Sequence, residues 1–448
     1  MLRRPSLAPP ADQRRSAGKA LRQQVPRSWH ASWAPGADRA DPIALLRRSD
    51  RDRLKSLVPI RYGRMLDSPA AFLRGAAIIM AHDLAQTPVT GLRGWICGDA
   101  HLNNFGGFAT PERNFIFDVN DFDEACLGPW EWDIKRLAAS VVVAARVNGV
   151  KEDSCHAAAE ACVRSYRLRS RELAAMRFLD TWYSRLDAVN AVEHFDNKRV
   201  TEQADGATRR TNAETLPKLA ARVKGGYRIV DDPPLVSHAT QSLGNRLPAA
   251  WSAYRTTLSE DRRLLLDRYR MEDVARKVVG VGSVGLRCFV VLLLGNDDDD
   301  PLFLQLKEAR PSVLEALLDQ SPYSNQGKRV VSGQRILQAA SDLFLGWTRV
   351  RRVDYYVRQL RDMKFAVPTE ELGADDLTVY GELCGWVLAR AHACSGDPAR
   401  ISGYLGGGNA FDRAVAAFAV AYADQTERDY AALEAAVRAG RLPAERGL

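Results

Sequence analysis

Acids and an amide recur at defined spacings in one short stretch of the chain, between residues 97 and 133. It opens with the pattern D-x-H-x-x-N, formed by Asp99, His101 and Asn104. A carboxylate on a short loop can accept a proton from an attacking hydroxyl group. An amide oxygen close to it can bind a magnesium ion, which prefers hard oxygen ligands. This spacing of a base and a ligand is typical of phosphoryl transfer.

A second group of acids follows an apolar strand expected at residues 114–117, and its members are Asp118, Asp121 and Asp123. Carboxylates placed after this strand could converge with the Asn104 amide on magnesium. Phosphoryl transfer uses a base, an amide ligand and a carboxylate ligand in this order along the chain. The alternative is a polar hairpin whose Asp and Asn side chains serve turns.

A glycine-rich turn forms the second chemical segment of the chain. Gly280, Gly282 and Gly285 match G-x-G-x-x-G, and Ser283 lies between them. A dinucleotide-binding turn must be followed by a helix, whereas the run CFVVLLL after this turn is rich in β-formers. A kinase phosphate loop instead joins two antiparallel strands and precedes a third strand that carries a lysine. The sequence fits the second pattern, and a plain glycine-rich hairpin is the alternative.

Lys307 occupies the third strand of this segment, among apolar neighbours in an alternating pattern. A lysine in such a place is costly unless it has a partner, which favours a functional role. In a kinase-like enzyme the partner would come from the helix expected after residue 330, but no Glu lies at the expected distance. Glu308, Glu315 and Gln334 therefore stay open as partners.

The segment around Asp99 resembles the catalytic segment of the aminoglycoside phosphotransferase and choline kinase branch of the protein-kinase-like superfamily. That branch carries H-G-D-x-H-x-x-N, a D-F-x-D-A-like strand, and G-P-x-x-x-D before a helix; this chain has CGDAHLNN, DFDEA and GPWEWD. The resemblance implies that Asp99 is the catalytic base and that Asn104 and Asp121 bind Mg²⁺. It also implies that Asp133 supports the loop. Cys97 stands where that branch has its first His.

From about Pro59 to Tyr430 the chain resembles the DUF2252 family, an uncharacterised bacterial family placed with kinase-like folds. In ordinary kinases the glycine loop and its lysine precede the catalytic loop, whereas here they follow it. The resemblance therefore implies an α+β, two-lobed protein-kinase-like fold that is circularly permuted, with a mainly helical large lobe and a small antiparallel β lobe. Permutation is tolerated when the termini lie near each other at the surface.

Several elements must position these residues. Ser68–Leu84 has apolar residues at helical spacing, and a strongly apolar helical pattern runs from Asp133 to about Ser170. A short helix is expected at Pro311–Leu318 and an edge strand at Tyr355–Leu360. Gln359–Asp362 is expected as a hinge whose backbone would hold adenine. The expected organisation is a disordered basic tail at 1–40, large-lobe residues 41–270, a small lobe at 271–369 and helices returning to the large lobe at 370–448.

Composition limits the classes of function. The chain has 448 residues, of which 46% are hydrophobic and 26% charged, as in ordinary globular proteins. No apolar run approaches the roughly 20 residues needed to cross a bilayer, so no membrane partner is expected. Seven scattered cysteines without a C-x-x-C pair favour neither disulfides nor zinc and indicate the cytoplasm. The net charge of +8 gathers in the Arg-rich tail, which predicts at most weak contacts with nucleic acid.

These observations predict an ATP-dependent phosphotransferase acting on a hydroxyl of a small molecule or protein. Lys307 and the glycine loop would hold the phosphates of ATP, and Asp118 and Asp123 would share the Mg²⁺ ions. His101 would fix the loop through a hydrogen bond. Two alternatives stay open: a nucleotide-binding module that is inactive or transfers AMP, and a nucleic-acid-associated protein with an acidic metal site. The acceptor and the oligomeric state have no signal in the sequence.

Overall fold

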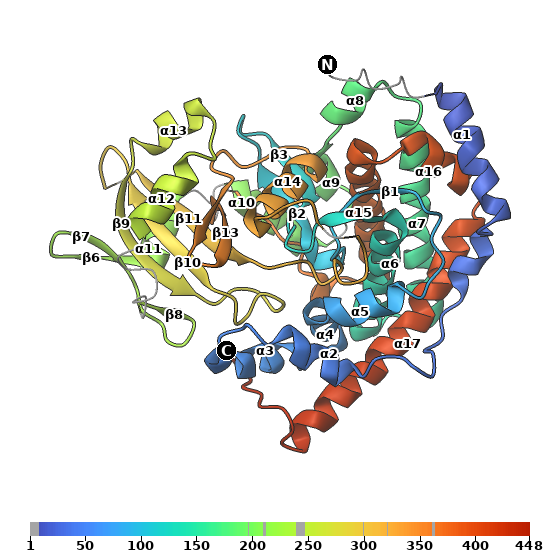
Figure 1. Ribbon diagram of the computed structural model, residues 1–448, viewed down its shortest axis with the longest axis horizontal. Coiled ribbons are helices and arrows are strands. Elements are labelled where there is room, and N and C mark those ends of the chain that lie inside the picture. The colour runs from blue at the N-terminus through green and yellow to red at the C-terminus, as the bar shows by residue number, and fades with distance from the viewer. Residues whose placement is uncertain are drawn as a thin grey trace.

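The computed structural model describes residues 9–195, 197–208, 212–238, 247–298, 300–319, 321–360 and 363–448. The chain is mixed α+β, with most long helices on one side and a six-stranded antiparallel sheet on the other (Figure 1). The predicted α+β class and antiparallel strands are confirmed. The acidic segment and the glycine-rich turn both lie where the two sides meet.

The helical side is built around α6 (Trp130–Val147), whose side chains are buried along almost its whole length. A helix that is buried on every face needs neighbours all round. Helices from distant parts of the chain supply them (Figure 1). They are α7 (Glu152–Leu173), α15 (Ala374–Ser395), α16 (Pro398–Leu405) and α17 (Ala410–Arg438).

Four short helices cover the side of the molecule that faces the glycine-rich turn. The predicted helix Ser68–Leu84 is split in two, because the backbone leaves the helical region at Ala76. The Ser68 side chain caps the first part by accepting from the backbone N–H of Ala71. The four helices are α2 (Pro42–Ser49), α3 (Val58–Met65), α4 (Pro69–Gly75) and α5 (Ala77–Leu84).

The six-stranded sheet has the order β12-β13-β11-β10-β9-β8, and all its pairs are antiparallel. Its strand β10, CFVVLLL, is buried on both faces, which explains why its sequence is continuously apolar instead of alternating. The strands are β8 (Val236–Ser237), β9 (Arg270–Lys277), β10 (Cys288–Leu294), β11 (Pro301–Ala309), β12 (Gly346–Val350) and β13 (Val353–Gln359).

Small elements from the middle of the chain cover this sheet. Tyr254 of α12 belongs to the same core as Phe289 of β10, and Ile229 of β7 packs with Val290 on the opposite face. The core of the sheet therefore extends beyond the predicted range 271–369. The covering elements are α11 (Asn212–Leu219), β6 (Ala220–Val223), β7 (Gly226–Ile229), α12 (Leu247–Arg255) and α13 (Glu260–Leu266), and α14 (Gln326–Leu337) joins the sheet to the helices.

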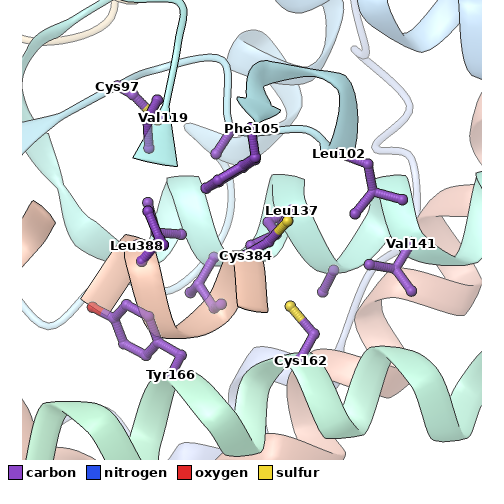
Figure 2. Close-up of a cluster of buried hydrophobic side chains, with 14 of the residues drawn as sticks. Cys97, Leu102, Phe105, Val119, Leu137, Val141, Cys162, Tyr166, Cys384 and Leu388 are labelled. Atoms are coloured by element: carbon purple, nitrogen blue, oxygen red, sulfur yellow. The ribbon is translucent and has the colours of Figure 1, made fainter. Parts of the chain in front are cut away.

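The acidic segment folds into short strands that rest on the helices. Its side chains Leu102 and Phe105 lie over Leu137 of α6 and Cys384 of α15 (Figure 2). The segment is thereby fixed to the most buried part of the molecule. The strands are β1 (Arg93–Ile96), β2 (Phe105–Ala109), β3 (Phe115–Val119) and β4 (Cys126–Pro129), and β5 (Leu186–Asp187) joins β3; α8 (Phe178–Tyr183), α9 (Ala188–Val192) and α10 (Lys198–Thr208) flank β5.

The prediction of a disordered tail at 1–40 is wrong for residues 9–40; residues 1–8 lie outside those described. Here α1 (Ala11–Ala20) packs on α16. Arg22 donates to the backbone oxygen of Tyr404 at 2.9 Å, and Arg27 donates to that of Leu405 at 2.7 Å. These oxygens belong to the last turn of α16, where carbonyl groups have no intrahelical donor and the helix dipole favours cations. The arginines that suggested disorder therefore cap a distant helix.

Two further expectations are wrong. Residues 311–318 form turns instead of a helix. The strand expected at the edge of the sheet, β13, is an inner strand between β11 and β12. The last residues of the helix expected after residue 330 belong to β12 instead. None of the helices in the described residues is both long and apolar enough to span a membrane.

Candidate active site

A cavity of about 300 Å³ lies between the acidic segment, the glycine-rich turn and the helices α2–α5. This volume is at the lower end of the range for small-molecule sites. The cavity brings together eight of the twelve site residues predicted from the sequence: Asp99, His101, Asn104, Asp121, Asp123, Gly280, Gly282 and Ser283.

The loop that carries Asp99 is held from below by α6. The backbone N–H groups of Cys97 and Gly98 donate to the Asp133 carboxylate at 2.8 and 2.9 Å. Gly98 has a φ of +76°, and a Cβ there would lie 2.4 Å from the backbone oxygen of Glu124. Only glycine fits this turn without displacing the backbone. Asp133 therefore lies where the resemblance to kinase-like enzymes implied, under the loop.

Asp99 itself is positioned by Arg136 of α6, whose Nε donates to Oδ1 at 2.6 Å. Arg136 is buried and also donates to the backbone oxygen of Leu73 at 2.9 Å. Burial raises the pKa of Asp99 to about 7, against the opposing effect of Arg136 and with a further rise from Glu124 and Asp121. A carboxylate with this pKa can gain or lose a proton near neutral pH, as a general base must.

His101 does not make the predicted hydrogen bond. Its Nδ1 is buried and has no hydrogen-bond partner among the described residues, and its Nε2 lies 3.7 Å from Asp99 Oδ2. Burial, together with Arg136 and Arg74, lowers the pKa of His101 well below its usual value, so the imidazole is neutral. The loop is fixed by Asn104 instead, whose Nδ2 donates to the backbone oxygen of Asp99 at 2.7 Å.

Lys307 meets the acids after β3. Its Nζ lies 2.5 Å from Asp123 Oδ2 and 3.8 Å from Asp121 Oδ2. The ammonium is 2% exposed and does not line the cavity, whereas the side chains of Asp121 and Asp123 are 34% and 22% exposed. The acids therefore separate Lys307 from the open space of the cavity.

Charge pairing sets the ionisation of this group. Burial alone would lower the pKa of Lys307, but Asp121 and Asp123 hold it well above its usual value. Burial alone would raise the pKa of Asp123, but Lys307 lowers it. The lysine is therefore charged and the carboxylate ionised at neutral pH. Oδ1 of Asp123 is buried and has no hydrogen-bond partner among the described residues.

Each of the three residues considered as a partner of Lys307 pairs with another residue. Glu308 pairs with Arg287 at 3.0 Å, and Glu315 pairs with Arg329 at 3.3 Å. The side chain of Gln334 donates to Gln338. The helix α14 carries no acid. The partners of Lys307 come instead from the connection between β3 and β4.

The glycine-rich turn joins β9 to β10 and lies over the acids. Gly280 and Gly285 have φ angles of +64° and +89°, which favour glycine. Ser283 Oγ lies 3.5 Å from Asp123 Oδ2, which makes this a long and weak hydrogen bond. Gly285 does not line the cavity; its backbone oxygen accepts from the N–H of Leu54 at 2.8 Å.

Arginines from the N-terminal helices anchor the same turn. Nη1 of Arg53 donates to the backbone oxygen of Val284 at 2.5 Å, and Nη1 of Arg64 donates to that of Gly280 at 2.5 Å. Val284 is fully buried among Leu57 and Ile60. The turn is therefore fixed to α3 and to the segment before it.

Asp118 does not share the position of the other acids. Its carboxylate is buried outside the cavity and accepts from the backbone N–H groups of Val119 and Ala339, at 2.8 and 2.7 Å. Burial raises the pKa of Asp118 to about 6, although Arg390 opposes the rise. Side chains alternate along β3, and Asp118 joins the strand to the segment that follows α14. The expectation that it shares a metal ion is wrong.

The expected hinge is only partly described, because residues 361 and 362 lie outside the described ranges. The backbone N–H of Gln359 donates to Asp342 Oδ2 at 2.5 Å, so it is not available to adenine. A small cavity of about 40 Å³ lies beside it, lined by Gln359, Arg358 and Asn120 among others. Arg358 fills this space and donates to the backbone oxygen of Asn120 at 3.0 Å.

The oxygen atoms around Asp123 suit a hard cation. Among the described residues, no group of three or more His, Cys, Asp or Glu side chains is arranged to hold a metal ion by itself. Mg²⁺ is usually held by one or two carboxylates together with the phosphates of a substrate. The unpartnered Oδ1 of Asp123, the exposed carboxylate of Asp121 and the amide of Asn104 fit that mode of binding.

Several residues of the site were not found from the sequence. Arg136 lies on a face of α6 that reads as plain core, and its only signal is a charge inside an apolar helix. Nε2 of His392 donates to Asp133 Oδ2 at 3.2 Å, and its Nδ1 lies 2.9 Å from the Tyr166 hydroxyl oxygen. His392 belongs to the run LARAHA at the end of α15, which is far from the loop in sequence.

Comparison with known proteins gives one match. A family model described as "Uncharacterized protein conserved in bacteria (DUF2252)" matches residues 53–436. No curated protein and no solved structure matches the chain.

Proposed function

The chain belongs to the DUF2252 family of bacterial proteins, and we propose that it is an ATP-dependent phosphotransferase with a circularly permuted, two-lobed protein-kinase-like fold. The proposal rests on one observation, the contact of Lys307 with Asp121 and Asp123 beside the glycine-rich turn. These groups come from distant parts of the chain. A lysine, a glycine loop and paired acids are what the phosphates of ATP and their metal require.

The reaction is phosphate transfer to a hydroxyl group of the acceptor. Asp99 accepts the hydroxyl proton while the hydroxyl oxygen bonds to the γ-phosphorus of ATP. The bond between that phosphorus and the β–γ bridging oxygen breaks, and ADP leaves with the electron pair. The pKa of Asp99, raised by burial to about 7, suits this proton transfer. Arg136 keeps the carboxylate oriented towards the cavity.

The phosphates of ATP would lie between the glycine-rich turn and the acids. Asn104, Asp121 and Asp123 would hold magnesium, which when bound neutralises the charge that develops on the phosphate oxygens. Asp123 is an ion-pair partner of Lys307 before nucleotide arrives. Release of one carboxylate from Lys307 would therefore accompany the entry of a metal and expose the ammonium to phosphate.

One alternative keeps the nucleotide and changes the chemistry. Lys307 is buried behind its acids and does not line the cavity, which favours a nucleotide-binding module that is inactive or transfers AMP. The nucleic-acid alternative loses support, because Arg22 and Arg27 of the supposed tail are engaged with α16.

Thermal unfolding with and without ATP and Mg²⁺ tests nucleotide binding. We expect ATP to raise the melting temperature only when Mg²⁺ is present, and we expect Asp121→Asn to abolish the rise. Asp121 is one-third exposed, so this variant should fold. An unchanged melting temperature in the wild-type protein would rule out the phosphotransferase and both nucleotide-binding alternatives.

Slow ATP hydrolysis separates the phosphotransferase from those alternatives. We expect Asp99→Asn to reduce the release of phosphate by about 10²–10⁴-fold while ATP still stabilises the protein. Release of pyrophosphate instead of phosphate would indicate AMP transfer. Stabilisation by ATP without any turnover would indicate an inactive binding module.

A further inference from the structure

Five arginines line the cavity together with the acids. We call them the arginine wall. Its members come from α2, α3, α4 and the connections after α2 and β11: Arg48, Arg53, Arg61, Arg74 and Arg310.

Two members of the arginine wall share a single carboxylate partner. Arg61 and Arg53 share one carboxylate, Asp50, at 2.8 and 3.4 Å. The same carboxylate also accepts from the Tyr62 hydroxyl. All of these side chains are buried, so water does little to screen the remaining positive charge. Burial, with Arg61 adding to it, lowers the pKa of Arg53 well below its usual value.

The other members of the arginine wall are even less balanced. Arg310 donates to the backbone oxygen of Ser49 at 3.0 Å, and its ion pair is with the exposed carboxylate of Asp52, at 3.5 Å. The side chains of Arg48 and Arg74 have no hydrogen bond or ion pair with any residue that the structure describes. The five arginines therefore share the cavity with the carboxylates of Asp99, Asp121, Asp123, Glu124 and Glu308, and Arg48 and Arg74 have no ion pair with any of them.

The charge of Arg74 interacts with that of the proposed base, Asp99. Burial lowers the pKa of Arg74, and the carboxylates of Glu370 and Asp99 oppose this change. Its charge also acts on His101, next to Asp99. The backbone oxygen of Arg74 lies 3.3 Å from the place of a Cβ on Gly282, so α4 also meets the glycine-rich turn. An anionic group bound by Arg74 would therefore share the cavity with the base.

We propose that the acceptor carries a phosphate or carboxylate group, which the arginine wall binds while a hydroxyl of the same molecule faces Asp99. This inference rests on the proposed function for the hydroxyl but not for the anion site. Guanidinium groups bind phosphate and carboxylate through paired, charge-assisted hydrogen bonds. A cationic acceptor such as an amine would be repelled by the same wall.

The test measures melting temperatures with inorganic phosphate, with succinate, and with ATP and Mg²⁺. The proteins are the wild type, Arg74→Gln, Asp121→Asn and the control Arg171→Gln, which removes an exposed arginine of α7 outside the cavity. We expect phosphate or succinate to stabilise the wild type and the control. Arg74→Gln should weaken this binding about tenfold, because hydrogen bonds to a charged group are lost. Whichever anion binds tells which group the acceptor carries.

ATP separates this inference from the proposed function. We expect ATP and Mg²⁺ to stabilise Arg74→Gln as they do the wild type, and the anions to stabilise Asp121→Asn. If Arg74→Gln loses the effect of ATP as well, the arginine wall holds the nucleotide and the inference fails while the function stands. If neither anion binds, or both bind Arg74→Gln unchanged, the inference also fails. If ATP has no effect on the wild type but the anion still depends on Arg74, the anion site stands and the function fails.

Discussion

Lys307 and Lys135 are both buried lysines in the middle of apolar segments, but they are stabilised differently. Lys307 Nζ lies 2.5 Å from Asp123, and its pKa is held well above the usual value by acids. Lys135 is 0% exposed on α6, and its Nζ has no hydrogen bond within the described part of the chain. It lies 5.0 Å from the centre of the Phe418 ring, and burial lowers its pKa to about 7 although Glu131 opposes this.

This difference shows which of the two buried lysines indicates a functional site. Burial alone is common to both, so it does not identify chemistry. What distinguishes Lys307 is a pair of carboxylates that also reach a cavity. Lys135, on the helical side, meets mainly hydrocarbon and an aromatic ring, so its burial lowers the stability of the fold.

The largest expected effect comes from removing the paired lysine. Lys307→Met should lower the free energy of unfolding by about 3 kcal/mol, because two carboxylates lose their cation. This is the lower end of the range for a broken buried pair, since Asp121 is one-third exposed. Urea denaturation at pH 7 measures it. A loss below about 1 kcal/mol would show that the contact contributes little.

The unpaired lysine should behave in the opposite way. Lys135→Met should raise the free energy of unfolding by about 2 kcal/mol, because a thioether of similar length replaces an amine without a hydrogen bond. The same urea titration measures it. Destabilisation by Lys135→Met would remove the contrast between the two lysines.

The pH dependence of stability should follow from the same shift. The pKa of Lys135 is about 7 in the folded protein and about 10.4 when unfolded, so the unfolded chain binds more protons between these values. Stability from this group therefore rises as pH increases from 7 towards 10, by up to about 1.4 kcal/mol per pH unit. The wild type should therefore gain stability relative to Lys135→Met over that range. A difference that stays constant with pH would contradict the shifted pKa.

The proposed base, Asp99, should show its own pH dependence, in activity. Burial raises the pKa of Asp99 to about 7, and only the ionised form can accept a proton. The kcat/KM for ATP turnover should therefore rise about tenfold per pH unit below 7 and level off above it. A midpoint near pH 4 would show that Asp99 is ionised throughout and that its burial has no kinetic effect.

The smallest effect should come from the contact between the glycine-rich turn and the acids. Ser283→Ala should change the free energy of unfolding by less than about 0.5 kcal/mol, because Oγ lies 3.5 Å from Asp123. Urea denaturation of Ser283→Ala, carried out in parallel with that of Lys307→Met, measures this change. A large loss would mean that the serine, as well as the lysine, holds the acids in place.

Local patterns were enough to predict the chemical segments. The D-x-H-x-x-N spacing placed Asp99 and Asn104 on one loop, and the turn residues predicted the hairpin with Gly280 and Gly285. Strand alternation placed Lys307 inside the sheet. The resemblance to DUF2252 is confirmed by the match over residues 53–436.

Contacts between distant segments could not be predicted. The partner of Lys307 is Asp123, which lies on a connection that no local pattern links to β11. The arginines of residues 9–40 look disordered in sequence, but they find carbonyl groups at the end of α16. Asp118 was assigned to the metal because it is close in sequence to Asp121, although strand alternation turns it the other way.

The anchoring of the glycine-rich turn has a consequence for binding. Arg53 and Arg64 hold backbone oxygens of this turn at 2.5 Å, and its Val284 is buried. A ligand that meets the turn therefore finds a formed surface and loses less conformational entropy to order it. Association should in this respect be close to rigid docking, with affinity decided mainly by charge and fit.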